Sequence, residues 1–355
     1  MSNDSSHPFP FQRRLAHYDL LRLVGILAVI VLHVSADIFH LPISVFGWKS
    51  AFFYDSCVRF GVPVFVMLSG VFFLSPAKEI PLRQLYGKYI PRIAAALVFW
   101  SLFYTACVQW YSGEVLSWAV FLQTAMSGDS YHLWFCYAIL GLYIVTPCLR
   151  KITADSPTTA YFLLLWLVFL ILIPYLLRNS DNLCFLKDFL NKFPLNFTTV
   201  LGGYFVLGYF LHSWRMSLSV ESLLYMMGMA GLAVTFCGTW YSSIAVGHGT
   251  AMFYRESSFN VVLVSAAIFT FFSKRVSQIP FPEAIQKILS FLATQVFGIY
   301  LVHIFFFRLL GLLGITGRTF QPMVWIPFLA VVIFGCSLTA TLCLRKIPGI
   351  GKWIV

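Results

Sequence analysis

Charged residues are scarce in this chain, and their scarcity excludes a soluble protein. Only 10% of the 355 residues are Asp, Glu, Lys or Arg, whereas 59% are hydrophobic. Soluble domains carry about 25% charged residues. Acids are the rarer sign, with 13 against 24 Lys and Arg. These cations fall in short loops between apolar runs and not on one polar face, so we expect no nucleic-acid partner.

The chain also lacks the motifs of several enzyme classes. It has no Walker A motif, no GxGxxG, no HExxH and no GxSxG. Their absence argues against an ATPase, a nicotinamide enzyme, a zinc protease and a lipase-type hydrolase. The eight cysteines show no CxxC or Cys/His metal spacing. We interpret them as small buried hydrophobic residues and predict neither disulfides nor a metal site.

What the sequence does contain is a series of apolar runs, each long enough, or nearly so, to cross a bilayer. The ten runs are 18–40, 57–75, 91–110, 132–148, 159–177, 197–213, 222–240, 257–273, 290–311 and 323–344. They predict an all-α, polytopic membrane protein of about ten helices. The fourth and sixth runs are the shortest and contain glycine, which suggests tilted or partly re-entrant segments.

The loops between the runs predict an orientation. Alternate loops hold fifteen Lys and Arg residues on one side and six on the other. Because the richer side is usually cytoplasmic, we expect both termini in the cytoplasm. One membrane domain then covers residues 18–344, between a cytoplasmic N-terminal segment 1–17 and a cytoplasmic tail 345–355. The polar start of the chain predicts no signal peptide.

Two ionisable residues lie inside the first run. Arg22 and His33 are eleven residues apart, so they share one helix face at a separation of roughly 16 Å along the axis. Such residues are costly in a bilayer and favour a functional interpretation. The alternatives are that Arg22 pairs with Asp19 and extends to the headgroups, and that His33 is a neutral core residue. Asp37 is either an orienting partner for His33 or a solvated residue at the helix end.

Further candidates lie in the second, fourth and ninth runs. Arg59 begins the second run near the expected level of His33. Its Pro63 predicts a kink, and Ser69-Gly70 predicts a packing seam. His132 and Trp134 open the fourth run, where an interfacial aromatic belt also explains Trp134. Tyr300 and His303 share one face of the ninth run, and two intramembrane histidines in outer halves suggest a polar cavity.

Cations also gather in the inner loop 76–92. Arg83, Lys88 and Arg92 lie in or beside this loop. The inner-side excess of positive charge accounts for them fully. Their use as an anion site is therefore a secondary hypothesis.

Four segments together resemble the acyltransferase-3 family of bacterial membrane O-acyltransferases. They are the R-x10-H pattern of Arg22 and His33, VPVFVMLSG at 62–70, YHLWFCYAILGLYIVTP at 131–147, and FGIYLVH at 297–303. A weaker fifth segment is GYFVLGYFL at 203–211. The resemblance implies about ten helices in a bacterial inner membrane. It also implies transfer of an acyl group, usually acetyl from cytoplasmic acetyl-CoA, to a hydroxyl of a cell-envelope glycan or lipid-linked sugar.

The family's essential Arg and His correspond to Arg22 and His33. A neutral His can act as a general base or as a transient acyl carrier. Arg22 suits a phosphate of the donor, near Arg83, Lys88 and Arg92. We expect the acceptor side to include Arg59, His132, Trp134, Tyr300 and His303. The alternative function is a transporter or flippase for a glycan or lipid intermediate.

Overall fold

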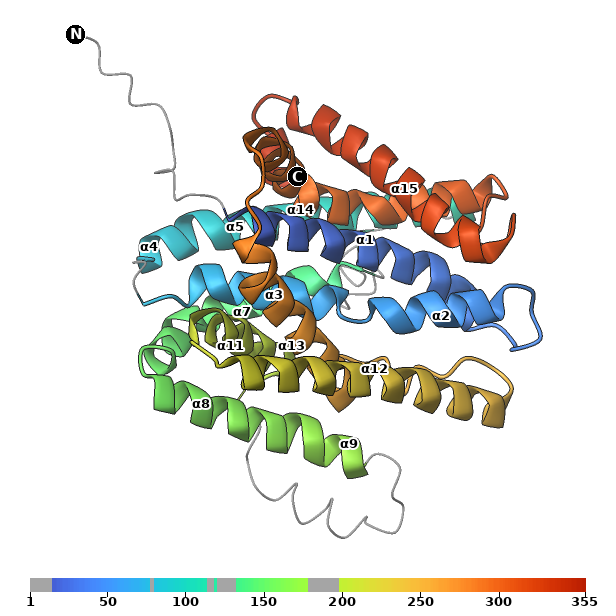
Figure 1. Ribbon diagram of the computed structural model, residues 1–355. Helices are drawn as coiled ribbons and strands as arrows, with labels where there is room; N and C mark the ends of the chain where they lie inside the picture. The colour runs from blue at the N-terminus through green and yellow to red at the C-terminus, as the bar shows by residue number, and fades with distance from the viewer. Residues whose placement is uncertain (1–14, 77–79, 114–117, 120–131, 178–197) are drawn as a thin grey trace.

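The computed structural model describes residues 15–76, 80–113, 118–119, 132–177 and 198–355. Within these residues the fold is all-helical, and strand pairing is limited to one isolated bridge between Pro42 and His248. Figure 1 shows the helices as a bundle. The α-helices are α1 Ala16–Phe39, α2 Trp48–Val58, α3 Gly61–Phe73, α4 Leu82–Gln84, α5 Ile90–Ser112, α7 Trp134–Ile152, α8 Ser156–Leu165, α9 Ile173–Leu177, α11 Val200–Ser213, α12 Leu218–Val246, α13 Phe259–Lys274, α14 Glu283–Leu312, α15 Pro322–Arg345 and α16 Gly351–Ile354. Short π-helical segments, Leu85–Tyr89 and Trp166–Leu172, join α4 to α5 and α8 to α9, and a 3-10 turn, Val276–Gln278, follows α13.

Nine helical segments of the described chain are long and apolar enough to cross a membrane. The prediction of an all-α polytopic membrane protein is therefore confirmed. The sixth predicted run is α11, which has 14 residues and is too short for that group. At about 1.5 Å per residue it is roughly 21 Å long, against a hydrocarbon core of about 30 Å.

The predicted kink in the second run is a break between two helices. α2 ends at Val58 and α3 begins at Gly61. Pro63 has no N–H to donate to the carbonyl of Arg59, four residues earlier, so the helical bond that would bridge the break is missing. The break places the Arg59 side chain at a helix junction.

Helix α1 lies at the centre of the bundle. It packs against α2, α3, α13, α14 and α15 (Figure 1). Leu21, Ile26, Ile30 and Val34 of α1 are almost completely buried. The helix that carries Arg22 and His33 is thus enclosed by protein along most of its length.

Two glycines bring α3 and α11 into close contact. A β-carbon on Gly70 would lie 1.8 Å from the carbonyl oxygen of Phe205, and one on Gly208 would lie 2.2 Å from that of Met67. Only glycine leaves room for the facing backbone at these two places. The prediction of a packing seam at Ser69-Gly70 is confirmed for Gly70.

Contacts between helix ends sort the bundle into two faces. The start of α1 meets the end of α13, where the Tyr18 hydroxyl donates to Ser273 over 3.1 Å. On the opposite face, the segment after α1 meets the segment after α12, where the Ile43 N–H donates to the Gly247 carbonyl over 3.0 Å. The start and the end of α1 thus lie on opposite faces, as expected for a helix that crosses the bundle. Which face is cytoplasmic remains a prediction from the loop charges.

The predicted tail 345–355 packs against the bundle. Trp100 of α5 donates its indole N–H to the Ile354 carbonyl over 2.7 Å, and Arg92 donates to the Val355 carbonyl over 3.2 Å. Because Arg92 begins α5, this segment lies on the same face as the start of α1. Most of the predicted N-terminal segment, residues 1–14, lies outside the described residues.

Candidate active site

Three histidines from distant parts of the chain meet inside the bundle. The ring centroids of His33 and His303 are 5.2 Å apart, and those of His132 and His303 are also 5.2 Å apart. His303 is 0% exposed and His132 is 3% exposed, whereas His33 is partly exposed. The two intramembrane histidines that suggested a polar cavity thus lie side by side, and His33 is the most exposed of the three.

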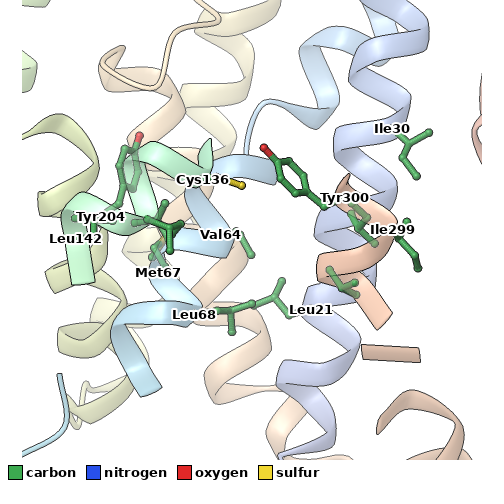
Figure 2. Packing of buried hydrophobic residues seen from close by; sticks show 14 of the residues in the cluster. Leu21, Ile30, Val64, Met67, Leu68, Cys136, Leu142, Tyr204, Ile299 and Tyr300 are labelled. Carbon is green, nitrogen blue, oxygen red and sulfur yellow. The ribbon is translucent and has the colours of Figure 1, made fainter. Parts of the chain in front are cut away.

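Two tyrosines hold the cluster in place. The Tyr300 hydroxyl donates to the backbone carbonyl of His132, and the Tyr104 hydroxyl donates to the Leu301 carbonyl over 2.7 Å. Figure 2 shows the Tyr300 hydroxyl pointing toward the helix that carries Cys136. These bonds tie α14 to α5 and to the segment before α7. They fix the helix turn from which His303 projects.

Hydrogen bonds also fix where two of the imidazoles carry their protons. Nδ1 of His303 lies 2.6 Å from the Tyr300 carbonyl oxygen, and Nε2 of His132 lies 3.3 Å from the Leu301 carbonyl oxygen. A carbonyl only accepts, so both nitrogens donate. In the neutral rings, the lone pairs are therefore on Nε2 of His303 and Nδ1 of His132.

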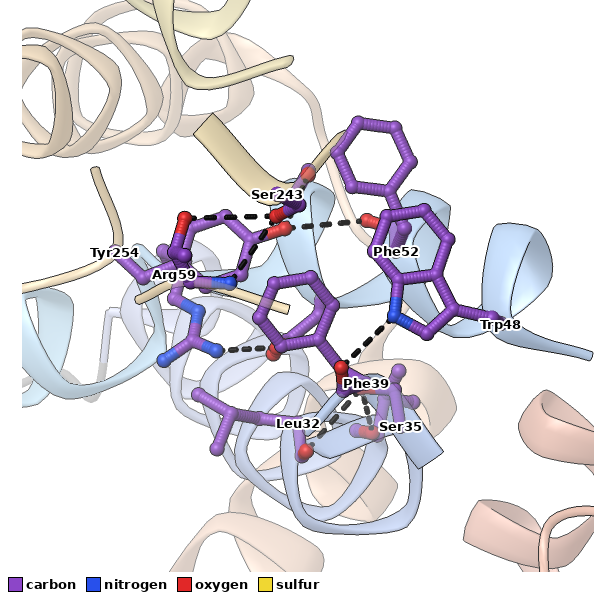
Figure 3. A network of polar contacts seen from close by, with 12 residues as sticks. Leu32, Ser35, Phe39, Trp48, Phe52, Arg59, Ser243 and Tyr254 are labelled. Atoms are coloured by element: carbon purple, nitrogen blue, oxygen red, sulfur yellow. Dashed lines mark hydrogen bonds and ion pairs between the residues drawn. The ribbon is translucent and has the colours of Figure 1, made fainter. Parts of the chain in front are cut away.

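Arg59 and its polar neighbours lie beside the cluster, away from the start of α1 that carries Arg22. Arg59 pairs with the fully buried Asp55, and its guanidinium lies 4.0 Å from the centre of the Tyr254 ring (Figure 3). The Tyr254 hydroxyl lies 2.7 Å from the Ser56 hydroxyl, and burial raises the pKa of Tyr254, which keeps its proton. Arg59 is also close enough to His33 for its charge to act on that ring. Arg59 and His33 are therefore near neighbours.

Arg22 lies toward the other face. Its guanidinium contacts Asp19 at 2.7 Å and lies 4.7 Å from the centre of the Phe72 ring, and its side chain remains 29% exposed. The pairing with Asp19 is the one that the sequence suggested. Both alternatives for Arg22, headgroup contact and donor binding, are compatible with this exposure.

The other predicted donor-side cations are not at the histidine cluster. Arg83 and Lys88 are exposed. Arg92 binds the Val355 carbonyl, and its guanidinium lies 6.0 Å from the centre of the Phe297 ring. Arg22 and Arg92 nevertheless share a neighbour, since the charges of both act on the Tyr143 hydroxyl.

Trp134 and Asp37 lie apart from the cluster. Trp134 is 38% exposed and its ring packs beside the adjacent Phe135, as an interfacial aromatic residue would. Asp37 is exposed, which fits a solvated residue at the end of α1. Sequence reasoning missed Tyr104 and Asp55. Asp55 precedes Arg59 by four residues, a spacing typical of an ion pair on one helix face. Tyr104 is one of many aromatic residues, and no pattern in the sequence distinguishes it.

The cluster does not have the geometry of a metal centre. Among the residues that the structure describes, no group of three His, Cys, Asp or Glu side chains is arranged to hold a metal ion. A neutral imidazole can act as a general base or as a nucleophile.

The fold defines the class of the protein as a polytopic, all-helical membrane protein. The acyltransferase domain model of the acyltransferase 3 family matches residues 15–342. The chain thus belongs to this family and is a membrane-bound acyltransferase. No curated protein and no solved structure matches it.

Proposed function

We propose that the protein is an O-acetyltransferase of a bacterial inner membrane, which moves an acetyl group from cytoplasmic acetyl-CoA to a hydroxyl of a cell-envelope glycan or lipid-linked sugar. The observation that carries the proposal is the meeting of His33, His132 and His303 inside the bundle. Of these, only His33 is partly exposed. His33 is therefore the imidazole that meets the acceptor hydroxyl or receives the acyl group.

The donor is proposed to enter from the face of Arg22. Arg22 lies roughly 16 Å from His33 along α1, a separation that suits an elongated thioester and not a single shared atom. A permanently charged, planar guanidinium suits a phosphate. Arg92, which shares the neighbour Tyr143 with Arg22, and the exposed Arg83 and Lys88 add positive charge for the rest of the donor.

The acceptor is proposed to approach from the face of Arg59. Arg59, His132, Tyr300 and His303 lie at or next to the cluster, whereas Trp134 would contact only the outer part of a long acceptor. On its length and on the segment around VPVFVMLSG, we propose a likeness to the enterobacterial common antigen O-acetyltransferase. A repeating-unit sugar of that kind of glycan is therefore the first acceptor to test.

Mass spectrometry of envelope glycans from cells with and without the gene tests this proposal. We expect one sugar to lose the mass of one acetyl group when the gene is removed. Purified His33→Ala protein should release no CoA from acetyl-CoA in the presence of acceptor, whereas the exposed His248→Ala control should match wild type. Full activity of His33→Ala would refute the site. Movement of an unmodified glycan across the membrane would instead support a carrier.

A further inference from the structure

We propose that His303 is a positioning residue for His33: its Nε2 accepts a hydrogen bond from the Nδ1–H of His33 while His33 holds the proton of the acceptor hydroxyl. This inference rests on the proposed function and assigns a role that the transfer reaction alone does not require. The two rings are 5.2 Å apart between centroids. The Nδ1 atom of His33 is buried.

The protonation of His303 is the first step of the argument. Its Nδ1 lies 2.6 Å from the Tyr300 carbonyl and must donate there. The lone pair of the neutral ring is therefore on Nε2. Among the described residues, Nε2 of His303 is buried and has no hydrogen-bond partner. A buried acceptor without a partner is costly. A neutral His33 whose free lone pair is on Nε2 carries its proton on Nδ1, and this Nδ1–H removes that cost when it donates to His303.

The surroundings of His33 explain why such an acceptor matters. An imidazolium at His33 would form close to Arg59, in a setting where charge is poorly solvated. His303 is 0% exposed, so it cannot itself meet the acceptor, but a neutral acceptor behind His33 stabilises the cation that forms there. Asp37, the carboxylate nearest in sequence, is exposed and does not offer a buried alternative.

The other ionisable groups around His303 leave it as a neutral acceptor. His132 faces it at 5.2 Å between ring centroids and donates its own Nε2–H to Leu301. Tyr300 lies 5.9 Å away and donates its hydroxyl proton to the His132 carbonyl. Arg308 acts on His132 from further along α14. The neighbouring Tyr104 is committed to the Leu301 carbonyl.

The reaction balances with His33 as the base. The acceptor oxygen gives its proton to Nε2 of His33 and forms a bond to the acyl carbon. The carbon–sulfur bond breaks, and its electron pair goes to the CoA sulfur. His33 then passes its proton to that thiolate, so CoA leaves as the thiol. The Nδ1–H of His33 stays on the ring throughout, so His303 keeps its hydrogen bond and exchanges no proton.

The test compares two substitutions of His303 in the full-length protein. Gln offers an oxygen acceptor in place of Nε2, whereas Leu offers none. We expect His303→Leu to lower kcat by about 100-fold or more, with KM for acetyl-CoA unchanged, and His303→Gln to stay within about tenfold of wild type. His248→Leu, an exposed histidine change, is the matched control.

A pH profile separates positioning from a structural role. The acid limb of kcat/KM should move to lower pH in His303→Leu, because the protonated form of the base is less stable there, and should return with Gln. Should His303→Leu fail to fold, His303→Met provides the same comparison. The inference would be overturned if folded His303→Leu or His303→Met kept the wild-type kcat. It would also be overturned if His303→Gln and His303→Leu lost kcat equally at unchanged Tm. If His33→Ala is inactive and His303→Leu is fully active, the inference about His303 fails and the proposed function stands.

Discussion

Gly70 of α3 and Phe205 of α11 approach so closely that a β-carbon on Gly70 would lie 1.8 Å from the Phe205 carbonyl oxygen. We predict that Gly70→Ala pushes the two helices apart and lowers the free energy of unfolding by about 1–3 kcal/mol. Tm in detergent measures the effect. Gly335→Ala in α15, where a β-carbon meets nothing within 4 Å, is the control and should not lower Tm. Equal Tm values for both variants would contradict the close contact.

The buried ion pair of Asp55 and Arg59 gives a second prediction. Their side chains are 0% and 16% exposed, so Arg59→Met leaves a buried carboxylate without its cation. We expect a loss of about 3 kcal/mol in stability, partly recovered when Asp55→Asn is added. Lys287→Met breaks an ion pair whose partners are 75% and 81% exposed and should change stability by less than about 1 kcal/mol. No recovery in the double variant would argue against the pairing.

Trp100 gives a third prediction, for the segment that ends the described chain. Trp100→Phe keeps the aromatic packing and removes the indole N–H that binds the Ile354 carbonyl. The loss should be about 1 kcal/mol, because a buried acceptor loses its donor. Trp110 is 85% exposed, so Trp110→Phe is the matched control. Protease sensitivity of the last residues should rise in the first variant only, and an unchanged cleavage rate would count against the contact.

Asp155, between α7 and α8, gives a prediction on pH. Hydrogen bonds from the Thr158 hydroxyl and from the Thr158 N–H, the latter at 2.9 Å, hold the pKa of Asp155 below its ordinary value of 3.8. A lowered native pKa means that the charged cap stabilises α8 above pH 3.8 and that this contribution is lost as the pH falls through the native value. Asn caps without a charge. The Tm advantage of wild type over Asp155→Asn should therefore shrink between about pH 6 and about pH 3, and a constant difference would refute it.

The positions of the helices along the chain were more predictable than the contacts between helices. Hydropathy indicated ten apolar runs, because a bilayer demands them, and Pro63 marked the break after α2. The second run, 57–75, missed most of α2, which begins at Trp48. The spacing of Arg22 and His33 follows from the helix alone. That His33 meets His303, however, depends on how α1 packs against α14, which no local pattern encodes.

His132 illustrates the same limit. Its position beside Trp134 suggested the membrane interface, yet Trp134 is 38% exposed and His132 is 3% exposed. Two residues of chain separate an interfacial ring from a buried one, and His132 is buried where it contacts the Leu301 carbonyl and the Tyr300 hydroxyl of α14. Tertiary hydrogen bonds of this kind are invisible in one sequence.

The central position of α1 also has a consequence for how the protein is made. Its partners α13, α14 and α15 begin at Phe259 and beyond, so they leave the ribosome long after α1 has done so. At about 5–20 residues per second, that delay lasts on the order of tens of seconds. During this time His33 lacks its neighbour His303 of α14, whereas Arg22 already has Asp19 and, soon after, Phe72 of α3. The packing around the proposed reactive residue is therefore completed only late in synthesis.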